Sequence, residues 1–502
     1  MTTVSRRTAL AGGVALAACG PTSVLAPRVK VPGASFGGSP FSFGVASGDP
    51  RSDAVVLWTA LELDDARAGE DVSVGYEVAA DAFFERVLRS GVITARVDAG
   101  HTVKVDVTEL PAGTPLFYRF VVPGQVSTIG KTKTLPAPGA TPEQFRFGIG
   151  CCQDFRDGLF TAHRHAAAES FDAFFFLGDF IYEKNTAGVR QHDTPEPLDL
   201  AGYRARYRQY RRDADLQASL ASCPWVLTWD DHEVVNDYGG LETPAGVVAG
   251  FSERRAAAYR AYSEWTPIRA APADDSSLLL YRAFSVGQLL DVTVLDTRQY
   301  RSRLVCGGRS GPACSDRGRD DDSILGAAQR EWLFERLRAS TASWNVMAQQ
   351  VVFSDFDIAN GAFLNHDQWD GYPAERNRVL DVLDALPSRN TVLLTGDIHL
   401  GALSRVLRKG TSRASAVEIV TNSISSGGSK GSGNGAVIEG LVGSVPGFMY
   451  AYEGARGYTA CTVTPQSWQV DFRVVDQIDS PGGALSTHAS FDLQRDLLVR
   501  RR

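Results

Sequence analysis

The alternation of short apolar runs with longer amphipathic segments, which begins at Phe145, restricts the fold of this chain more than any other feature. Short apolar runs predict buried strands, and apolar residues recurring every three or four positions predict helices. The predicted strands are Phe145–Ile149, Ala173–Leu177, Trp225–Trp229, Leu290–Leu295, Val346–Ala348 and Val392–Thr395, and the predicted helices include Ser252–Trp265, Gly326–Ala339 and Ala374–Leu386. Strands alternating with helices indicate an α/β domain whose functional site lies at the carboxyl ends of the strands.

Three later apolar runs predict further strands, at Ala416–Thr421, Gly457–Val463 and Trp468–Val475. These late strands suggest a second sheet that packs on the first.

Polar clusters follow five of these predicted strands directly. They are Gly150-Cys151-Cys152-Gln153-Asp154, Gly178-Asp179-Phe180-Ile181-Tyr182-Glu183, Asp230-Asp231-His232-Glu233, Gln349-Gln350 and Gly396-Asp397-Ile398-His399. Burying a carboxylate is costly unless it is paired or bound to a metal. A thiol, a phenol, an imidazole and several carboxylates favour iron(III) beside a second divalent ion. Two such metals activate a water for in-line displacement at phosphorus.

Each cluster also has a simpler interpretation when it is taken alone. An aspartate after a strand is often a helix cap, and a lone buried cysteine is usually a core residue. The occurrence of five clusters in order, each at the end of a predicted strand, is what favours a functional site.

The order Cys-Gln, Gly-Asp-x-x-Tyr, Asp-His-Glu and Gly-Asp-x-His resembles the PhoD-type alkaline phosphatases, within the calcineurin-like metallophosphoesterases. Further matching stretches are Phe43–Pro50, Val56–Thr59, Leu295–Tyr300 and Leu325–Trp332. The resemblance implies a phosphoric ester hydrolase with Fe3+ and one or two Ca2+ ions, and a four-layer α/β/β/α catalytic domain. It also implies attack on phosphorus by a metal-activated hydroxide, with phosphate monoesters or diesters as substrates.

The resemblance assigns roles residue by residue. Cys152, Asp179, Tyr182 and His399 are the expected iron ligands, with Asp179 bridging to the second metal. Asp231, Asp397 and Gln349 are expected on the second metal, with Gln350 as the rival of Gln349. His232 is expected to donate to the phosphoryl oxygens or to protonate the leaving oxygen. Arg298, close after Asp296 at a strand end, is expected either to orient substrate phosphate or to pair with a neighbouring aspartate.

The segment before Phe145 has a different pattern, with short alternating runs at Val72–Val78, His101–Val107 and Leu116–Val122. Turn residues separate these runs, which predicts an antiparallel β-sandwich. We therefore expect a signal peptide at 1–20, a linker at 21–40, a sandwich domain at 41–138 and the catalytic domain at 139–502.

The first residues are typical of an export signal. Arg6-Arg7 precedes a short apolar stretch with no acidic residue, which indicates a signal peptide for the twin-arginine export machinery. Leu16-Ala17-Ala18-Cys19 resembles a lipobox, with an unmodified Cys19 as the alternative. A periplasmic or secreted protein, with or without a lipid anchor at Cys19, is the expectation.

Composition excludes other classes of partner. Lys and Arg number 51 against 58 Asp and Glu, and this net charge of −7 gives no reason to expect nucleic acid. No apolar run reaches the length of about 18 residues that a membrane-spanning helix needs. A serine hydrolase is excluded because no Gly-x-Ser-x-Gly elbow joins a strand to a helix.

Four smaller features also lead to expectations. Cys306 and Cys314 flank a Gly-rich loop and predict a local disulfide, while Cys151 is expected to be an inert residue pointing away from Cys152. The basic and aromatic run Tyr203–Arg212 indicates either a solvated helix face or a phosphate-attracting rim, with the solvated face favoured. The stretch Ser425–Gly435 predicts a mobile loop over the cleft.

Two rival functions follow from the same residues. One is a phosphodiesterase or phospholipase D-like enzyme that acts on lipid or cell-wall polymer phosphodiesters, and the loop from Glu183 to Tyr203 would control access. The other is a non-catalytic exported binding protein, which the intact Asp179, Asp231, His232, Asp397 and His399 argue against.

Overall fold

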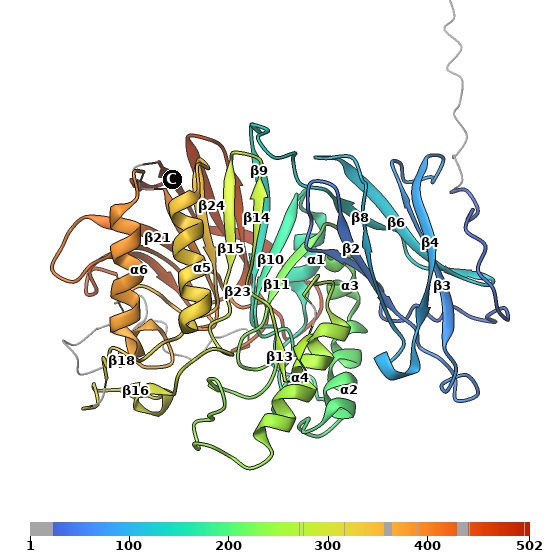
Figure 1. Ribbon diagram of the computed structural model, residues 1–502, viewed down its shortest axis with the longest axis horizontal. Helices are drawn as coiled ribbons and strands as arrows, with labels where there is room; N and C mark the ends of the chain where they lie inside the picture. The colour runs from blue at the N-terminus through green and yellow to red at the C-terminus, as the bar shows by residue number, and fades with distance from the viewer. Residues whose placement is uncertain are drawn as a thin grey trace, which may run out of the picture.

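A computed structural model describes residues 24–502, apart from 271, 275, 316, 356–363, 389, 429–439, 441 and 496, with the backbone alone for 272–274 and 364. Figure 1 shows two large sheets at the centre, with helices on their outer faces and the blue N-terminal strands at one end. The predicted signal peptide and Cys19 lie outside the described residues. Within the described part of the chain, no helix is long and apolar enough to cross a membrane.

The largest sheet has ten strands in the order β26-β25-β24-β23-β9-β10-β11-β1-β2-β5. Its strands are β1 (Val45–Gly48), β2 (Val55–Ala60), β5 (Thr102–Val107), β9 (Phe145–Gly150), β10 (Ala173–Leu177), β11 (Trp225–Thr228), β23 (Arg456–Val463), β24 (Ser467–Val475), β25 (Leu485–Gln494) and β26 (Val499–Arg501). β9, β10 and β11 are parallel neighbours, so their carboxyl ends meet at one edge of the sheet.

The second sheet has seven strands in the order β14-β15-β17-β19-β21-β20-β22. Its strands are β14 (Arg282–Val286), β15 (Leu290–Val294), β17 (Trp344–Ala348), β19 (Thr391–Thr395), β20 (Gly401–Leu407), β21 (Ala414–Val420) and β22 (Phe448–Tyr452). β15, β17, β19 and β21 are parallel neighbours, so the loops after β17 and β19 also leave from one edge.

The third sheet is the five-stranded one, with the order β4-β3-β6-β7 and with β8 paired to β6. Its strands are β3 (Val72–Ala79), β4 (Val87–Ala95), β6 (Pro115–Val122), β7 (Gln125–Val126) and β8 (Gly130–Lys133). Two short pairs complete the strands: β12 (Pro272–Asp274) with β13 (Ser277–Leu278), and β16 (Ser310–Gly311) with β18 (Leu364–Asn365).

Among the described residues, six α-helices lie between these strands: α1 (Thr161–Ala168), α2 (Leu200–Arg211), α3 (Ala214–Leu220), α4 (Phe251–Trp265), α5 (Gly326–Ala339) and α6 (Pro373–Ala385). Three buried cores hold these layers together, one between the two large sheets and two between a sheet and its helices. Phe147 and Phe175 of the first sheet share a core with Val346 and Leu394 of the second. Residues of α1 to α4 share a core with the opposite side chains of β10 and β11, and residues of α5 and α6 cover the second sheet.

The N-terminal strands belong to two sheets rather than to an isolated unit. β1, β2 and β5 extend the ten-stranded sheet, because β1 pairs in parallel with β11. Their inner side chains, including Leu57 and Val103, share a core with Val74 and Phe120 of the five-stranded sheet. Gly48 permits this junction, because a Cβ there would lie 2.4 Å from the Pro267 carbonyl oxygen.

The predicted elements of the catalytic part lie close to their predicted positions, but not in the predicted sheets. β10 and α5 have the predicted bounds, and the other predicted strands and helices differ by one or two residues at one or both ends. The three late strands do not form a second sheet of their own, because β23 and β24 extend the sheet of β9 and β21 pairs with β19 in the other sheet. The expectation for Tyr203–Arg212 was wrong, because helix α2 buries Tyr203, Arg206, Tyr207, Tyr210 and Arg211. Its stripe of alternating aromatic and guanidinium groups packs inward, where the arginine heads bind backbone carbonyls.

Candidate metal centre

The polar clusters predicted from the sequence meet in space at the carboxyl ends of the parallel strands. Cys152 follows β9, Asp179 and Tyr182 follow β10, Asp231 and His232 follow β11, and Asp397 and His399 follow β19. All seven side chains come from loops or turns. Five of them are nine-tenths buried or more, whereas Asp397 and His399 are half-buried. The parallel strands therefore place polar residues from distant parts of the chain next to one another, because the carboxyl ends of these strands lie together.

Four of these residues have a left-handed backbone. The φ angles are +55° at Cys152, +58° at Asp179, +65° at Asp397 and +58° at His399. Non-glycine residues seldom adopt this conformation, and residues held in it gather at functional sites. The reversed backbone turns each side chain toward the common centre instead of continuing the alternation of the strand.

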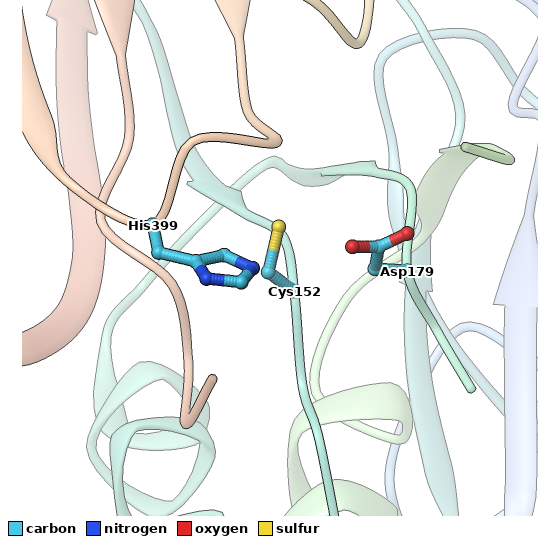
Figure 2. Close-up of side chains that lie close together, drawn as sticks. All are labelled: Cys152, Asp179 and His399. Atoms are coloured by element: carbon cyan, nitrogen blue, oxygen red, sulfur yellow. The ribbon is translucent and has the colours of Figure 1, made fainter. Parts of the chain in front are cut away.

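The first ligand set contains one thiol, one carboxylate and one imidazole. Donor atoms of Cys152, Asp179 and His399 all lie within 4.8 Å of one another. Figure 2 shows the Asp179 carboxylate and the His399 ring directed toward the Cys152 side chain from opposite sides. The Tyr182 hydroxyl joins them, since it donates to Asp179 Oδ2 at 2.8 Å and lies 3.1 Å from His399 Nε2.

The second ligand set shares residues with the first and is richer in carboxylates. Asp179 groups with Asp231 and His232, and Asp231 groups with Asp230 and Asp397, each group within 4.8 Å. Asp179 thus belongs to both sets, as a bridging ligand would. Two overlapping sets, one with sulfur and nitrogen donors and one mainly of oxygen donors, suit two different metal ions.

The electrostatics of the site call for cations. Burial, reinforced by the neighbouring aspartates, raises the pKa of Asp179 and of Asp397 well above the ordinary range. Burial likewise raises the pKa of the Cys152 thiol and of the Tyr182 phenol. Asp230 Oδ2 and Asp231 Oδ1 have no hydrogen-bond partner among the described residues. Anions that are buried, crowded and incompletely bonded fit a metal centre, because bound cations would offset their charge.

Arg298 supplies one cation from the chain itself. Its side chain is fully buried, and its guanidinium lies 2.5 Å from Asp230, 2.7 Å from Asp367 and 3.4 Å from Asp397. Asp231 lies 3.7 Å away. Although burial opposes the charged form, Arg298 and His232 lower the pKa of Asp231 below its ordinary value. Pairing with neighbouring aspartates, one of the two expectations for Arg298, is present in the structure. The other expectation, contact with substrate phosphate, stays a prediction.

His232 is held from one side by a carboxylate. Its Nδ1 donates to Glu183 Oε2 at 2.6 Å, and its ring stacks on Tyr182 with 4.1 Å between the ring centroids. Burial lowers the pKa of His232, but Glu183 and Asp231 outweigh it and raise this pKa to about 9. Because Glu183 occupies Nδ1, Nε2 is the nitrogen left for a reacting group.

Neither predicted glutamine is directed at the ligand sets. Gln349 accepts from Trp369 Nε1 at 2.8 Å and donates to Val351 and Thr395. Gln350 accepts from Thr297 and donates to Thr228 and Leu295. The carboxamides of both residues bind within the protein, and the role of Gln349 as a metal ligand stays a prediction.

Several residues of the site were not assigned from the sequence. Asp230 and Glu183 stand inside the predicted clusters, and their position beside Asp231 and Tyr182 was the available signal. Asp367 and Gln368 come from a segment without any recognised motif, yet Asp367 binds Arg298 and Gln368 donates to Asp397 Oδ2 at 2.6 Å. Only tertiary structure brings this segment to the site.

Two further features bear on expectations from the sequence. Cys151 and Cys152 are both free and buried; Cys151 Sγ lies 3.9 Å from the Thr421 and Asn422 carbonyls, and Cys152 Sγ lies 3.8 Å from the Asp397 carbonyl. The described start of the Ser425–Gly435 stretch is part of the site, since the buried Ser426 donates to the Tyr182 hydroxyl at 2.7 Å. Residues 429–435 lie outside the described residues.

Fold and site together define a metal-dependent enzyme of the α/β class, with ligands at the strand ends. Comparisons with known proteins identify the family. The family model of the PhoD-like phosphatase matches residues 147–472, and that of its N-terminal domain matches residues 26–136. Alkaline phosphatase D of Bacillus subtilis (strain 168) is 41% identical over 480 residues, covering 92% of this chain and 82% of that protein. A solved structure of PhoD matches with a TM-score of 0.88 and 39% identity over 93% of each chain.

The chain therefore belongs to the PhoD-like phosphatase family. It is a phosphoric ester hydrolase that depends on metal.

Proposed function

We propose that this phosphatase hydrolyses phosphate monoesters, and also accepts diesters, with release of inorganic phosphate at the Asp179–Asp231 centre. The observation that carries this proposal is that Asp179 belongs to both ligand sets and groups with Asp231 and His232. A site with two adjacent metals and a neighbouring proton donor is suited to displacement at phosphorus.

We assign iron(III) to the set of Cys152, Asp179, Tyr182 and His399, and calcium to the set of Asp231 and Asp397. A thiolate and an imidazole are ligands of transition metals, whereas calcium takes oxygen donors. Asp230 lies beside the calcium set and has one oxygen without a hydrogen-bond partner among the described residues. This oxygen makes Asp230 a further candidate ligand.

The bound metals would supply an activated water and neutralise the charge of the phosphate. The chain's own residues perform the remaining steps. His232 carries a proton at neutral pH, because its pKa is raised to about 9, where Glu183 and Asp231 outweigh the opposing effect of burial. Its free Nε2 is placed to give that proton to the leaving oxygen. Glu183 keeps the ring oriented through Nδ1 and also accepts from the Asn236 amide at 3.0 Å.

A diesterase acting on lipid or cell-wall polymers is the second candidate, and one observation favours it. Exposed apolar side chains gather on the loop between β11 and α4, where Val247 is 79% exposed and Leu241 52% exposed. Leu198, at 65%, lies on the loop that follows Glu183. Both loops leave the strand ends that carry the ligands, so these side chains would contact the apolar part of a lipid substrate.

We propose that the protein is exported through the twin-arginine machinery and works in the periplasm or outside the cell. Arg6-Arg7 and the apolar stretch after them support this proposal, and Cys19 is the candidate site of lipid attachment. The disulfide between Cys306 and Cys314 also suits an oxidising compartment.

We further propose a domain division at about residue 138 and a four-layer α/β/β/α order in the catalytic part. The three separate cores support the layers, and the shared core of β1 to β6 supports a sandwich over 41–138. The two family models, which meet between residues 136 and 147, support the same division.

One pair of measurements tests these assignments. The purified protein is analysed for iron and calcium, and phosphate release is measured from an aryl phosphate monoester, an aryl phosphate diester and a phospholipid. We expect iron and calcium in the protein and faster release from the monoester. Hydrolysis without either metal would refute the metal assignment, and a strong preference for the phospholipid would establish the second candidate function.

A further inference from the structure

Helix α2 contacts the loops that carry the ligands, although it supplies no ligand itself. Tyr203, Arg206 and Tyr210 are fully buried. Their spacing of three and four residues places them on one face of the helix. Each of the three binds the backbone of a loop that follows β9, β10 or β11.

Tyr210 joins the first two loops at one oxygen. Its hydroxyl accepts from the Phe155 amide and from the Tyr182 amide, each at 3.1 Å. Phe155 stands three residues after Cys152, and Tyr182 is itself in the first ligand set. The relative position of the Cys152 loop and the Tyr182 loop is thus fixed through one side chain.

The proton of the Tyr210 hydroxyl also has a defined partner. His192 Nδ1 lies 2.9 Å from the Lys184 carbonyl, which only accepts, so Nδ1 carries the hydrogen. Nε2 of this neutral ring then accepts from the Tyr210 hydroxyl at 3.2 Å. The hydroxyl therefore accepts two hydrogen bonds and donates one, and it leaves no capacity unused.

The other two residues hold the rest of the site. Arg206 donates to the carbonyls of Tyr182, Glu183 and Lys184, the segment that carries the partner of His232. Tyr203 donates to the Val234 carbonyl at 2.6 Å, three residues after Asp231. Arg254 also donates to the Val234 carbonyl, at 3.3 Å, so Tyr203 shares this position with a second donor.

We propose that α2 is a positioning helix for the metal centre: Tyr210, Arg206 and Tyr203 set the spacing of the β9, β10 and β11 loops and thereby the affinity for metal. This inference rests on the metal assignment made above. Residues that orient metal ligands typically change metal affinity or activity about 10–100-fold when they are replaced. A helix that served packing alone would not alter metal affinity when a single buried oxygen was removed.

The same helix provides a matched control. The Tyr207 hydroxyl is buried but has no hydrogen-bond partner among the described residues. Tyr207→Phe and Tyr210→Phe therefore remove the same atom from neighbouring turns, yet only Tyr210→Phe breaks bonds to the ligand loops. Tyr203→Phe is an intermediate case, because Arg254 still binds the Val234 carbonyl.

The experiment measures iron and calcium retained by the full-length protein after dialysis against increasing concentrations of chelator. We expect Tyr210→Phe to lose metal at a chelator concentration about tenfold or more below that of the unaltered protein. Tyr203→Phe should lose metal at a smaller shift, and Tyr207→Phe should match the unaltered protein. The rise in Tm on adding metal back to each stripped protein serves as a second readout independent of activity.

Equal metal retention by Tyr210→Phe and Tyr207→Phe would overturn the inference. If Tyr210→Phe does not fold, Tyr203→Phe decides: metal loss at a lower chelator concentration than for Tyr207→Phe supports the role of α2, and equal loss refutes it. An unaltered protein that binds neither iron nor calcium would instead overturn the metal assignment itself. Failure of the function and failure of the positioning role therefore give different results.

Discussion

His232 is the residue whose replacement best separates chemistry from metal binding. Its Nδ1 is bound to Glu183 and its ring stacks on Tyr182, so its position does not depend on a metal. His232→Asn should lower kcat about 10²–10⁴-fold, the usual contribution of a positioned proton donor, while iron and calcium remain bound. Steady-state kinetics and elemental analysis of the same preparation measure both effects.

Asp179→Asn is the comparison, because Asp179 belongs to both ligand sets. This variant should lose metal and activity together. The proton-donor role of His232 would be refuted if His232→Asn kept its full kcat with its metals bound.

His163 predicts how stability responds to acid. Burial lowers its pKa from 6.5 to about 3. Below about pH 6.5, His163 is therefore protonated in the unfolded chain but stays neutral in the folded protein. The free energy of unfolding consequently falls as the pH falls toward 3. One such proton contributes a slope of about 1.4 kcal/mol per pH unit. Denaturant unfolding between pH 6.5 and 4 should show this slope reduced in His163→Gln.

His163→Gln also provides its own check. His192 has the same lowered pKa of about 3 and stays in both proteins, so the difference between the two slopes belongs to His163 alone. Identical slopes in the two proteins would show that His163 is protonated in the folded state.

At the residue scale, the sequence indicated ligands but not the contacts between them. Asp179, Asp231, Asp397 and His399 were found because each follows an apolar strand within a short polar cluster. The pairing of Arg298 with Asp367 was not predictable, because 68 residues separate them and no motif marks the second. Gln349 stood at a suitable spacing, but its carboxamide turns toward Trp369.

At the scale of elements, the Cys306–Cys314 disulfide closes a loop beside the site. The structure confirms the predicted bond, with a sequence separation of eight between the two cysteines. The loop inside it contains β16, which pairs with β18, and the Arg309 carbonyl, which lies against His366 Nδ1. Strand β18 leads directly to Asp367, so the disulfide stabilises the segment that reaches Arg298.

Reduction of this disulfide should lower the free energy of unfolding by about 2 kcal/mol, as expected for a loop of this length. Thermal unfolding with and without a thiol reductant measures the change. In the double variant Cys306→Ser with Cys314→Ser, the reductant should have no further effect, because the four free cysteines of the described chain are buried. A reductant-induced shift that persists in the double variant would contradict this explanation.

The burial of helix α2 could not be predicted from its own sequence. Alternating arginines and tyrosines usually mark a solvated face, and this rule predicted the wrong exposure for Tyr203–Arg212. The guanidinium of Arg206 is stable inside the protein because five backbone carbonyls surround it, two of them from Thr194 and Pro195. Those carbonyls belong to loops, and their position is not encoded within the helix.

At the scale of the whole molecule, Asp49 connects the N-terminal strands to the catalytic part. Its carboxylate is fully buried and binds Arg282 through both oxygens, at 2.7 and 3.0 Å, while the Arg269 amide donates to it. Asp49→Asn removes the charge but keeps a side chain that tolerates its left-handed backbone, with φ of +44°. Arg282 would then be an unpaired and largely buried cation.

Asp49→Asn should therefore lower the free energy of unfolding by about 3 kcal/mol, the usual cost of breaking a buried ion pair. Denaturant titration measures this change. The control is Asp98→Asn, which breaks an exposed pair with Arg96 and should leave stability unchanged. Equal stability of Asp49→Asn and the unaltered protein would show that this ion pair does not hold the two parts together.

The sequence by itself determined the alternation of strands and helices and the polar clusters at the strand ends, because periodicity and cluster chemistry are local properties. Its motifs were also sufficient to indicate the family. Only tertiary structure decided that β1 pairs with β11, that Arg298 faces four aspartates, and that α2 holds three ligand loops. These contacts join residues far apart in the chain, and the order of strands in the sheets sets their distances.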